Sequence, residues 1–443
     1  MTAFFLFFAV LVIVILTTRF QMHPFLSLFI TSILYGLLTG MPLGIIINSI
    51  NEGFSGTLGK IGLIIVFGII IGTFLKNSGA AYTLADKVLN MVGRKRVSPA
   101  MGIIGYFVSI PVFADSGFLL VSPLNKSLSK RAGISLAGSA VALGLGLTAT
   151  HTMVPPTPGP VAAAGILGAD LGLVMMLGIP ISAIALVPGI FYAVWYASKT
   201  YIDPDPGVTE SEIEGRLVGA PGALKSSLPV VIPIVLIVLK SVTPGIADYL
   251  HPHVFSLLSF VGEPVIALLI GSFLALALPE KLVPEMLSSE GWIGTSLKDA
   301  ASILLITGAG GIFGKILQNS GIADNLGELL TGLHLSLWLP FLLAAAMKTA
   351  QGSSTVAMIT GASIMVPMMN SLGFTTELEK AMVVLVLGAG SIVVSHANDS
   401  FFWVVTQLTG MNVRTGYRLY TLGTFVLGTG AALVVFVSYL VLT

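Results

Sequence analysis

The sequence predicts an all-α polytopic membrane protein: an inverted-topology repeat with about ten transmembrane helices, two re-entrant hairpins and two interrupted helices. Three observations lead to this fold class. Of the 443 residues, 55% are hydrophobic and only 9% are charged, whereas soluble proteins carry about 25% charged residues. Apolar runs long enough to cross a bilayer recur along the whole chain. The two halves of the chain also share several motifs.

A membrane-spanning helix needs about 20 mostly apolar residues. Runs of this kind predict spans near 3–19, 25–41, 61–77, 134–164, 171–198, 228–246, 262–279, 301–318, 378–410 and 419–442. Two of them are interrupted by polar residues or prolines. The first is broken by THTMVPPTPGP at 150–160 and the second by SHANDSFFW at 395–403.

Two further apolar regions, 99–131 and 336–370, are too long for one span, and their halves are too short for two. Each has a centre of small and polar residues, FADSGF at 113–118 and KTAQGSST at 348–355. This pattern predicts two re-entrant hairpins, each of which enters and leaves the membrane on the same side.

The two halves resemble each other in two places. The segment 72–93, which begins GTFLKNSG, matches 314–333, which begins GKILQNSG, and the segment 122–146 matches 366–390. Each half contains five spans and one hairpin, and an odd number of spans turns the second half upside down relative to the first. The predicted organisation is a first repeat at 1–198, a cytoplasmic linker at 199–227 and a second repeat at 228–443.

The positive charges favour one orientation. With the N-terminus outside, fifteen of the 21 Lys and Arg residues lie inside. Only Lys60, Lys240 and Lys380 lie outside, and Lys76, Lys315 and Lys348 lie within or at the ends of apolar segments. Because cytoplasmic loops are enriched in Lys and Arg, both termini are expected in the periplasm.

Composition excludes several classes of function. A net charge of +1 offers no basic surface for nucleic acid, and the lack of cysteine excludes thiol catalysis and thiolate metal sites. The sequence contains no H-E-x-x-H, P-loop or G-x-S-x-G motif. We therefore expect no enzyme, no cofactor and no metal site.

The polar breaks predict a binding site near the middle of the membrane. Irregular backbone persists at that depth only where it is buried in protein or lines a cavity. The inward-pointing ends of broken helices offer unpaired N–H groups that attract anions. The sequence therefore indicates an anion site to which each half contributes one hairpin tip and one interrupted helix.

Five ionisable residues lie within the predicted spans: Asp115, His151, Lys348, His396 and Asp399. Such groups are costly in a membrane unless they are paired or hydrated. Asp115 is interpreted as a proton carrier, with helix capping or an ion pair to Lys348 as alternatives. Lys348 is interpreted as the partner of a substrate carboxylate, with an ion pair to Asp115 or Asp399 as the alternative. The two histidines have either a structural role or a role in hydroxyl binding and proton relay.

These motifs resemble those of the gluconate:proton symporter family, the gluconate permeases of the ion transporter superfamily. The resemblance covers nearly the whole chain and rests on HPFL (23–26), FADSGFLLVSPL (113–124), THTMVPPTPGP (150–160), LGAD (167–170), GAGGIFGKILQNSG (308–321), GSSTVAMIT (352–360) and SHANDSFFW (395–403). Two positions depart from the usual family pattern, because Thr157 replaces a histidine and Ser354 replaces an alanine. Both departures put the identity of the substrate in question.

The resemblance implies a proton-coupled symporter in the bacterial inner membrane that imports gluconate or a related small hydroxylated carboxylate by an elevator-type mechanism, as a homodimer. Alternatives are a sodium-coupled transporter, a transporter of D-amino acids or hydroxy acids, and an uncoupled anion facilitator. Asp115 and Asp399 are predicted to carry the coupling proton. The predicted substrate-binding residues are Ser116, Gly117, Thr150, His151, Thr152, Thr157, Lys348, Gly352, Ser353, Ser354, Thr355, Ser395, His396 and Asn398.

Overall fold

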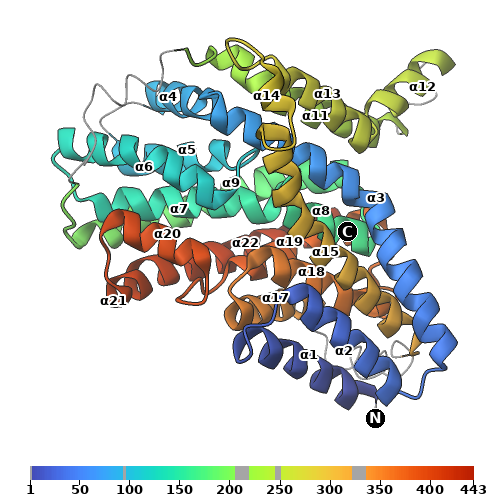
Figure 1. The fold of residues 1–443 in the computed structure, drawn as a ribbon. Helices are drawn as coiled ribbons and strands as arrows, with labels where there is room; N and C mark the ends of the chain where they lie inside the picture. Colours follow the sequence, from blue (N-terminus) through green and yellow to red (C-terminus); the bar gives the residue numbers. More distant parts are fainter. Residues whose placement is uncertain (1, 93–95, 205–218, 245–250, 322–335) are drawn as a thin grey trace.

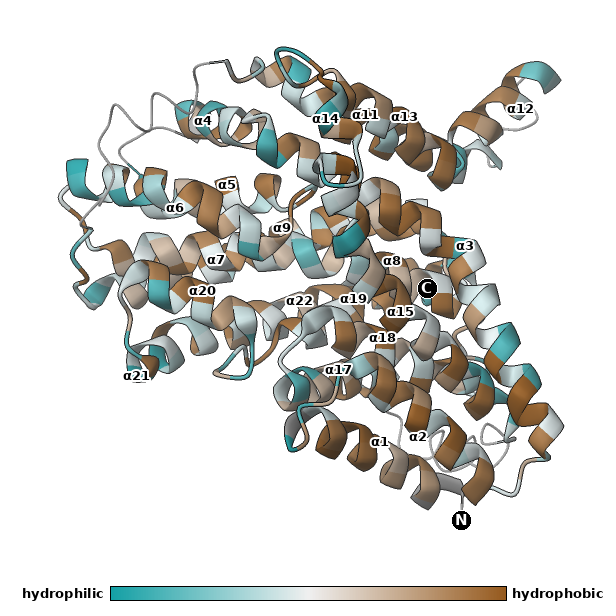
Figure 2. Cartoon of the chain, in the orientation of Figure 1, coloured by the Kyte–Doolittle hydropathy of each residue, from teal (hydrophilic) through white to brown (hydrophobic). Residues whose placement is uncertain are grey.

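The computed structural model describes residues 2–92, 96–204, 219–244, 251–321 and 336–443, and the described residues form helices and no strand (Figure 1). Part of the predicted linker, 205–218, and part of the second copy of the repeat motif, 322–333, lie outside these ranges. Apolar residues dominate most of the helices, and hydrophilic residues gather toward helix ends and connections (Figure 2). This distribution is the one expected of a protein that sits in lipid.

The first half runs from α1 to the short η1 helix, and most of its helices fall where apolar runs predict them. The elements are α1 (Thr2–Thr18), α2 (Pro24–Leu38), α3 (Leu43–Asn77), α4 (Ala80–Val92), α5 (Val97–Val108), α6 (Ala114–Arg131), α7 (Leu136–Met153), α8 (Pro158–Leu167), α9 (Leu171–Trp195) and η1 (Ala197–Lys199). The helix α3 begins 18 residues before the span expected at 61–77, because polar residues near its start do not interrupt the helix.

The second half contains the remaining elements. They are α11 (Ala223–Val242), α12 (Pro252–Val261), α13 (Pro264–Leu276), α14 (Pro284–Leu287), α15 (Trp292–Asn319), α17 (Trp338–Gln351), α18 (Ser354–Met365), η3 (Val366–Met368), α19 (Glu377–Ile392), α20 (Ser400–Thr409), α21 (Val413–Gly416), the π-helical turn η4 (Tyr417–Thr421) and α22 (Leu422–Leu442). The helix α12 projects from the edge of the molecule (Figure 1).

The number of spans agrees only loosely with the ten expected. Within the described ranges, six helical segments are long and apolar enough to cross a membrane, and a seventh appears if α12 and α13, bent by 66°, count as one. The difference has a physical cause: α1 and α2 have 17 and 15 residues, and α19 ends after 16 residues where the chain leaves helical conformation. Each of these helices is shorter than a typical span.

Glycines allow α3 and α15 to pack closely against each other and against the breaks in other helices. A Cβ atom added to Gly53 would lie 2.6 Å from the carbonyl oxygen of Gly311, where α3 meets α15. Further along α3, a Cβ atom at Gly72 would lie 2.3 Å from the carbonyl oxygen of Pro111, in the loop between α5 and α6. This close contact holds the loop between α5 and α6 against α3.

Candidate functional site

Three helices begin at one cavity in the middle of the protein. The cavity has a volume of about 150 Å³, and its wall includes the N-cap and the first two residues of α6, α18 and α20. These nine residues are Phe113, Ala114, Asp115, Ser353, Ser354, Thr355, Asp399, Ser400 and Phe401. Since the first N–H groups of a helix have no partner within it, the three ends together form a site with positive potential.

The local sequence explains why these helices start here. The loop between α5 and α6 contains Pro111, and the chain becomes helical again only at Ala114. The helix α17 ends at Gln351, and its C-cap residue Gly352 adopts a left-handed conformation with φ +81°. A Cβ atom at this glycine would lie 2.1 Å from the carbonyl oxygen of Asn398, so both the backbone conformation and the available space require glycine.

The prolines of the first interrupted helix have the effect that the sequence predicts. The helix α7 ends at Met153, and α8 begins with Pro158 in its first turn, where a missing N–H group costs nothing. The break is packed against α3, since a Cβ atom added to Gly68 would lie 3.2 Å from the carbonyl oxygen of Pro156. The C-terminal end of α7 nevertheless contributes Thr148 and His151 to the cavity wall.

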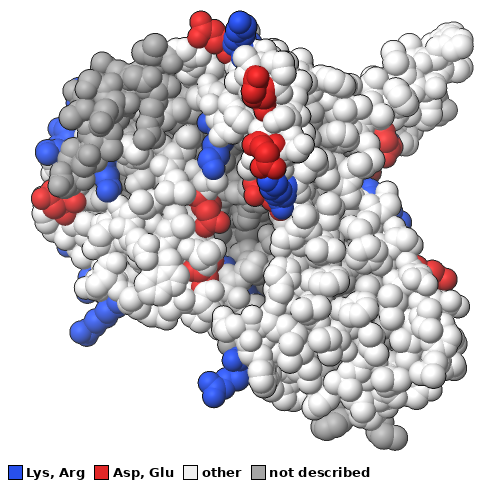
Figure 3. Space-filling view, in the orientation of Figure 1, with Lys and Arg blue, Asp and Glu red and all other residues white. Residues whose placement is uncertain are grey.

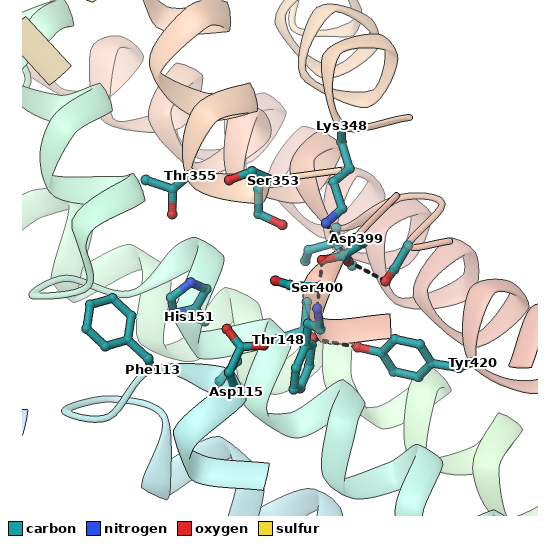
Figure 4. A pocket seen from close by; sticks show the side chains of 15 residues that line it. Phe113, Asp115, Thr148, His151, Lys348, Ser353, Thr355, Asp399, Ser400 and Tyr420 are labelled. Carbon is teal, nitrogen blue, oxygen red and sulfur yellow. Dashed lines mark hydrogen bonds and ion pairs between the residues drawn. The ribbon is translucent and has the colours of Figure 1, made fainter. Parts of the chain in front are cut away.

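Lys348 and Asp399 form a buried ion pair at one side of the cavity (Figure 4). The Lys348 Nζ lies 2.7 Å from Asp399 Oδ2, and the two side chains are only 3% and 7% exposed. Nζ also donates to the carbonyl oxygen of Gly352 at 2.6 Å, and Asp399 accepts from Ser395 Oγ and from the backbone N–H of Phe401. Of the partners that the sequence left open for Lys348, the structure places Asp399 beside it.

Asp115 and His151 also face the cavity (Figure 4). Asp115 Oδ1 and His151 Nδ1 are both buried, and within the described ranges neither atom has a hydrogen-bond partner. A buried polar atom without a partner costs about 1–3 kcal/mol. These two atoms are therefore available to bind a ligand in the cavity.

The other predicted residues that line the cavity are Ser353, Ser354, Thr355 and Ser395. Three of these hydroxyls are already used within the protein, and one of them, Ser395 Oγ, is the donor to Asp399 described above. Ser354 Oγ donates to the carbonyl oxygen of Ser391 at 2.8 Å, and Ser353 Oγ accepts from the backbone N–H of Val356. Ser353 and Thr355 lie across the cavity from Asp115 (Figure 4), so a bound molecule would contact both sides.

The remaining predicted residues do not line this cavity. His396 Nε2 and Asn398 Nδ2 both lie 2.8 Å from the carbonyl oxygen of Thr349, and Asn398 Nδ2 also donates to the carbonyl oxygen of Ala350. These two side chains thus satisfy carbonyl groups at the C-terminal end of α17. Their part in the structure is to join the second interrupted helix to α17.

Hydroxyls near the first break are satisfied by nearby backbone. Thr150 donates to the carbonyl oxygen of Tyr106, Thr152 to that of Thr148, and Thr157 to that of Val154. On α6, Ser116 accepts from Lys76 Nζ at 3.3 Å. The neighbouring Gly117 packs against Leu147, whose side chain would lie 2.6 Å from an added Cβ atom. Asp115 is thus the one residue of the predicted segment 115–117 on the cavity wall.

Several residues of the cavity are absent from the sequence prediction. They are Phe113, Ala114, Thr148, Ile392, Ser400, Phe401 and Tyr420. Tyr420 lies in the π-helical turn η4, and its hydroxyl is 3.1 Å from Thr148 Oγ1. The sequence could have indicated Phe113 and Ala114, because both belong to FADSGF, the predicted centre of the first hairpin. Nothing in the local pattern marks Tyr420.

Comparison with known proteins settles the family. The sequence profile of the GntP family permeases matches residues 1–441. The chain belongs to this family. It is 36% identical to an uncharacterized permease of Haemophilus influenzae, over 91% of this chain and 85% of that protein. It is 34% identical to a gluconate permease of Pseudomonas aeruginosa, over 92% of this chain and 91% of that protein.

More distant matches extend the comparison. A D-serine transporter of Escherichia coli is 31% identical over 94% of both chains. The fold is similar to that of the YdaH transporter of Alcanivorax borkumensis, with a TM-score of 0.66, 15% identity, and coverage of 94% of this chain and 98% of that chain. The resemblance of the sequence to the gluconate permeases is thereby confirmed, and so is an all-helical, membrane-embedded transporter fold.

Proposed function

We propose that this GntP family permease is a proton-coupled symporter that imports gluconate or a related small hydroxylated carboxylate across the bacterial inner membrane. The observation that carries the proposal is the convergence of the N-terminal ends of α6, α18 and α20 on one cavity. Helix N-termini bind carboxylates through their free N–H groups and their dipoles. The gluconate permease of Pseudomonas aeruginosa, a relative at 34% identity, supports this class of substrate.

The chemistry of the cavity wall fits a hydroxylated acid. The carboxylate of the substrate binds the backbone N–H groups at Ser354 and Thr355. The hydroxyls of the substrate contact His151 and the hydroxyl groups of Thr355 and Ser400. Lys348 stays paired with Asp399, so the positive potential at the site comes from the three helix N-termini. Asp115 carries the coupling proton, because its Oδ1 is buried at the cavity and has no partner within the described ranges.

Access from both sides follows from the repeat. The predicted hairpins 99–131 and 336–370, which contain α5 with α6 and α17 with α18, are re-entrant in this proposal. They move with the interrupted helices as an elevator against α3 and α15. The glycine pairs support the repeat: Gly68 and Gly72 precede Asn77 on α3 by the same intervals as Gly310 and Gly314 precede Asn319 on α15. In both copies these glycines pack against a hairpin or an interrupted helix.

Transport into proteoliposomes tests the proposal. With an inward proton gradient and choline in place of sodium, the purified protein should accumulate labelled gluconate or a shorter hydroxy acid above its equilibrium level. Accumulation that requires sodium would assign sodium as the coupling ion. Equilibration without accumulation under either gradient would indicate an uncoupled facilitator, and no flux of any sugar acid or hydroxy acid would refute the proposed substrate class.

A second candidate substrate is a small zwitterion such as D-serine. Asp115 stands across the cavity from the N-terminal end of α18 (Figure 4), which suits an ammonium group at one side and a carboxylate at the other. The D-serine transporter of Escherichia coli, a relative at 31% identity, supports this alternative. Competition distinguishes the two: unlabelled D-serine should displace labelled substrate only if the cavity accepts the ammonium group.

A further inference from the structure

A second, smaller cavity lies beside the central one, between α3, α6 and α15. It has a volume of about 80 Å³, and its polar wall consists of Thr73, Lys76, Asn77, Ser116, Thr295 and Asp299. These residues come from three helices that are far apart in the sequence. The binding site described above uses none of them.

Shared residues connect this cavity to its neighbours. Phe113 lines both the small cavity and the central cavity. Lys76 and Asn77 line both the small cavity and a wide cavity of about 570 Å³ that also reaches Tyr82, Glu280 and Trp292. The shared residues therefore arrange the three cavities in the order wide, small and central. The face of the protein drawn in Figure 3 is hollowed near its centre, and charged side chains lie at the rim of the hollow.

Phe113 is the residue that the linings of the small cavity and the central cavity share. Phe113 is the N-cap residue of α6, and its ring centroid lies 5.9 Å from that of His151, which faces the central cavity. The same ring lines a third space of only about 10 Å³ against Pro156 and Thr157. That space is too small to hold a substrate, whereas the cavity lined by Lys76 has a volume of about 80 Å³.

Lys76 is the basic group of the small cavity, whereas Lys281 lines the wide one. The Nζ of Lys76 donates to Ser116 Oγ at 3.3 Å, and within the described ranges Lys76 forms no ion pair. Lys315, the lysine near the same motif in the second half, instead pairs with Glu52 at 3.1 Å. Asp299 also lines the small cavity, and its negative charge would keep an anion beside Lys76 weakly enough bound to move on.

We infer that the small cavity is a transient binding site for the carboxylate substrate, with Lys76 as its anion-binding group and Phe113 as the barrier to the central cavity. The inference rests on the proposed function for the identity of the substrate. It adds a route of access and two residues that the binding site itself does not include.

The absence of cysteine from the chain allows a direct test. A single Thr73→Cys substitution places a thiol in the small cavity, one helical turn from Lys76. Its reaction rate is measured with an anionic reagent, sulfonatoethyl methanethiosulfonate, and with a cationic one, trimethylammonioethyl methanethiosulfonate. The ratio of the two rates reports the local charge and cancels any change in thiolate fraction.

Lys76→Gln in the Thr73→Cys background should lower the ratio of anionic to cationic rates about 25-fold, because a unit charge about 4 Å away in water changes each rate about fivefold in opposite directions. Lys298→Gln is the control. Lys298 precedes Asp299 on α15, but it pairs with Glu290 and is 64% exposed. An unchanged ratio in Lys76→Gln, or an equal fall in Lys298→Gln, overturns the role of Lys76.

The barrier is tested with Thr148→Cys, which places the thiol in the central cavity. Phe113→Ala should raise its reaction rate with the anionic reagent several-fold, while Phe107→Ala, which removes a ring that is 49% exposed at the end of α5, should leave the rate unchanged. Equal rates with and without the Phe113 ring overturn the barrier.

Transport separates this inference from the proposed function. In proteoliposomes, Lys76→Gln should raise the KM for carboxylate on one side of the membrane and leave the maximal rate near the wild-type value. If the wild-type protein carries no carboxylate but the labelling ratio still falls, the proposed function fails and the anion site at Lys76 stands. If the wild-type protein carries carboxylate and the ratio is unchanged, the inference fails alone.

Discussion

The ion pair between Lys348 and Asp399 makes a prediction that a double-mutant cycle can test. Both side chains are almost fully buried, and their charged atoms are 2.7 Å apart. Lys348→Met leaves Asp399 as an uncompensated buried charge, and Asp399→Asn leaves Lys348 in the same state. Breaking a buried pair by removing one partner costs about 3–5 kcal/mol, so each single variant should melt at a clearly lower temperature than the wild-type protein.

The double variant should recover part of this loss. With both charges removed, no charge of this pair is left unpaired, and the introduced amide retains a side-chain oxygen that can accept the N–H of Phe401, as Asp399 does at 3.1 Å. Coupling between residues in direct contact reaches about 0.5–3 kcal/mol. Lys348→Met/Asp399→Asn should therefore melt at a higher temperature than the less stable single variant.

Thermal unfolding in detergent, followed by the intrinsic fluorescence of the four tryptophans, measures these differences. Lys298→Gln is the matched control for the loss of a lysine, because Lys298 and its partner Glu290 are 64% and 84% exposed and exposed ion pairs contribute little to stability. The reasoning fails if the two single losses simply add in the double variant, or if Lys298→Gln is as destabilising as Lys348→Met.

Three further predictions follow from other parts of the site. Asp115→Asn should bind substrate but fail to accumulate it against a gradient, as flux measurements with and without a pH difference would show, and full accumulation would exclude Asp115 as the coupling group. Gly72→Ala should reduce folded yield and transport, since its Cβ would lie 2.3 Å from a backbone oxygen. Gly56→Ala on the same helix meets no atom within 4 Å and should be neutral or stabilising by up to about 1 kcal/mol, so similar yields of the two variants would contradict the close packing. Asn398→Ala removes two hydrogen bonds to the end of α17 and should lower the melting temperature without changing the KM for substrate; a selective rise in KM would instead place Asn398 in the binding site.

The helical breaks could be predicted from the sequence because they depend on local chemistry. Prolines at 155, 156, 158 and 160 exclude a continuous helix, and the structure has no helix between Met153 and Pro158. The polar centre at 113–118 was a less accurate guide. The break there covers residues 109–113, and Asp115 lies in the first turn of α6.

The partners across the site could not be predicted, because they depend on tertiary structure. Lys348 and Asp399 are 51 residues apart, and no local pattern chooses between Asp115 and Asp399 as the partner of the lysine. His396 and Asn398 were polar residues at membrane depth, which suggested binding. The structure instead directs them to carbonyl groups of α17, which are acceptors that a sequence pattern does not reveal.

The arrangement of charges explains why a carboxylate and a proton would bind together in this cavity. The charges of Lys348 and Asp399 offset each other, which leaves three helix N-termini at about +0.5 each and the carboxyl group of Asp115. An ionised Asp115 would compete with a substrate carboxylate for the same positive ends, since it lies in the first turn of one of those helices. Protonation of Asp115 removes this repulsion, and a bound anion in turn favours the protonated form by linkage. A lysine without a partner would instead attract an anion whether or not Asp115 is protonated, so in the proposed symporter the pairing of Lys348 with Asp399 would make anion binding depend on the proton.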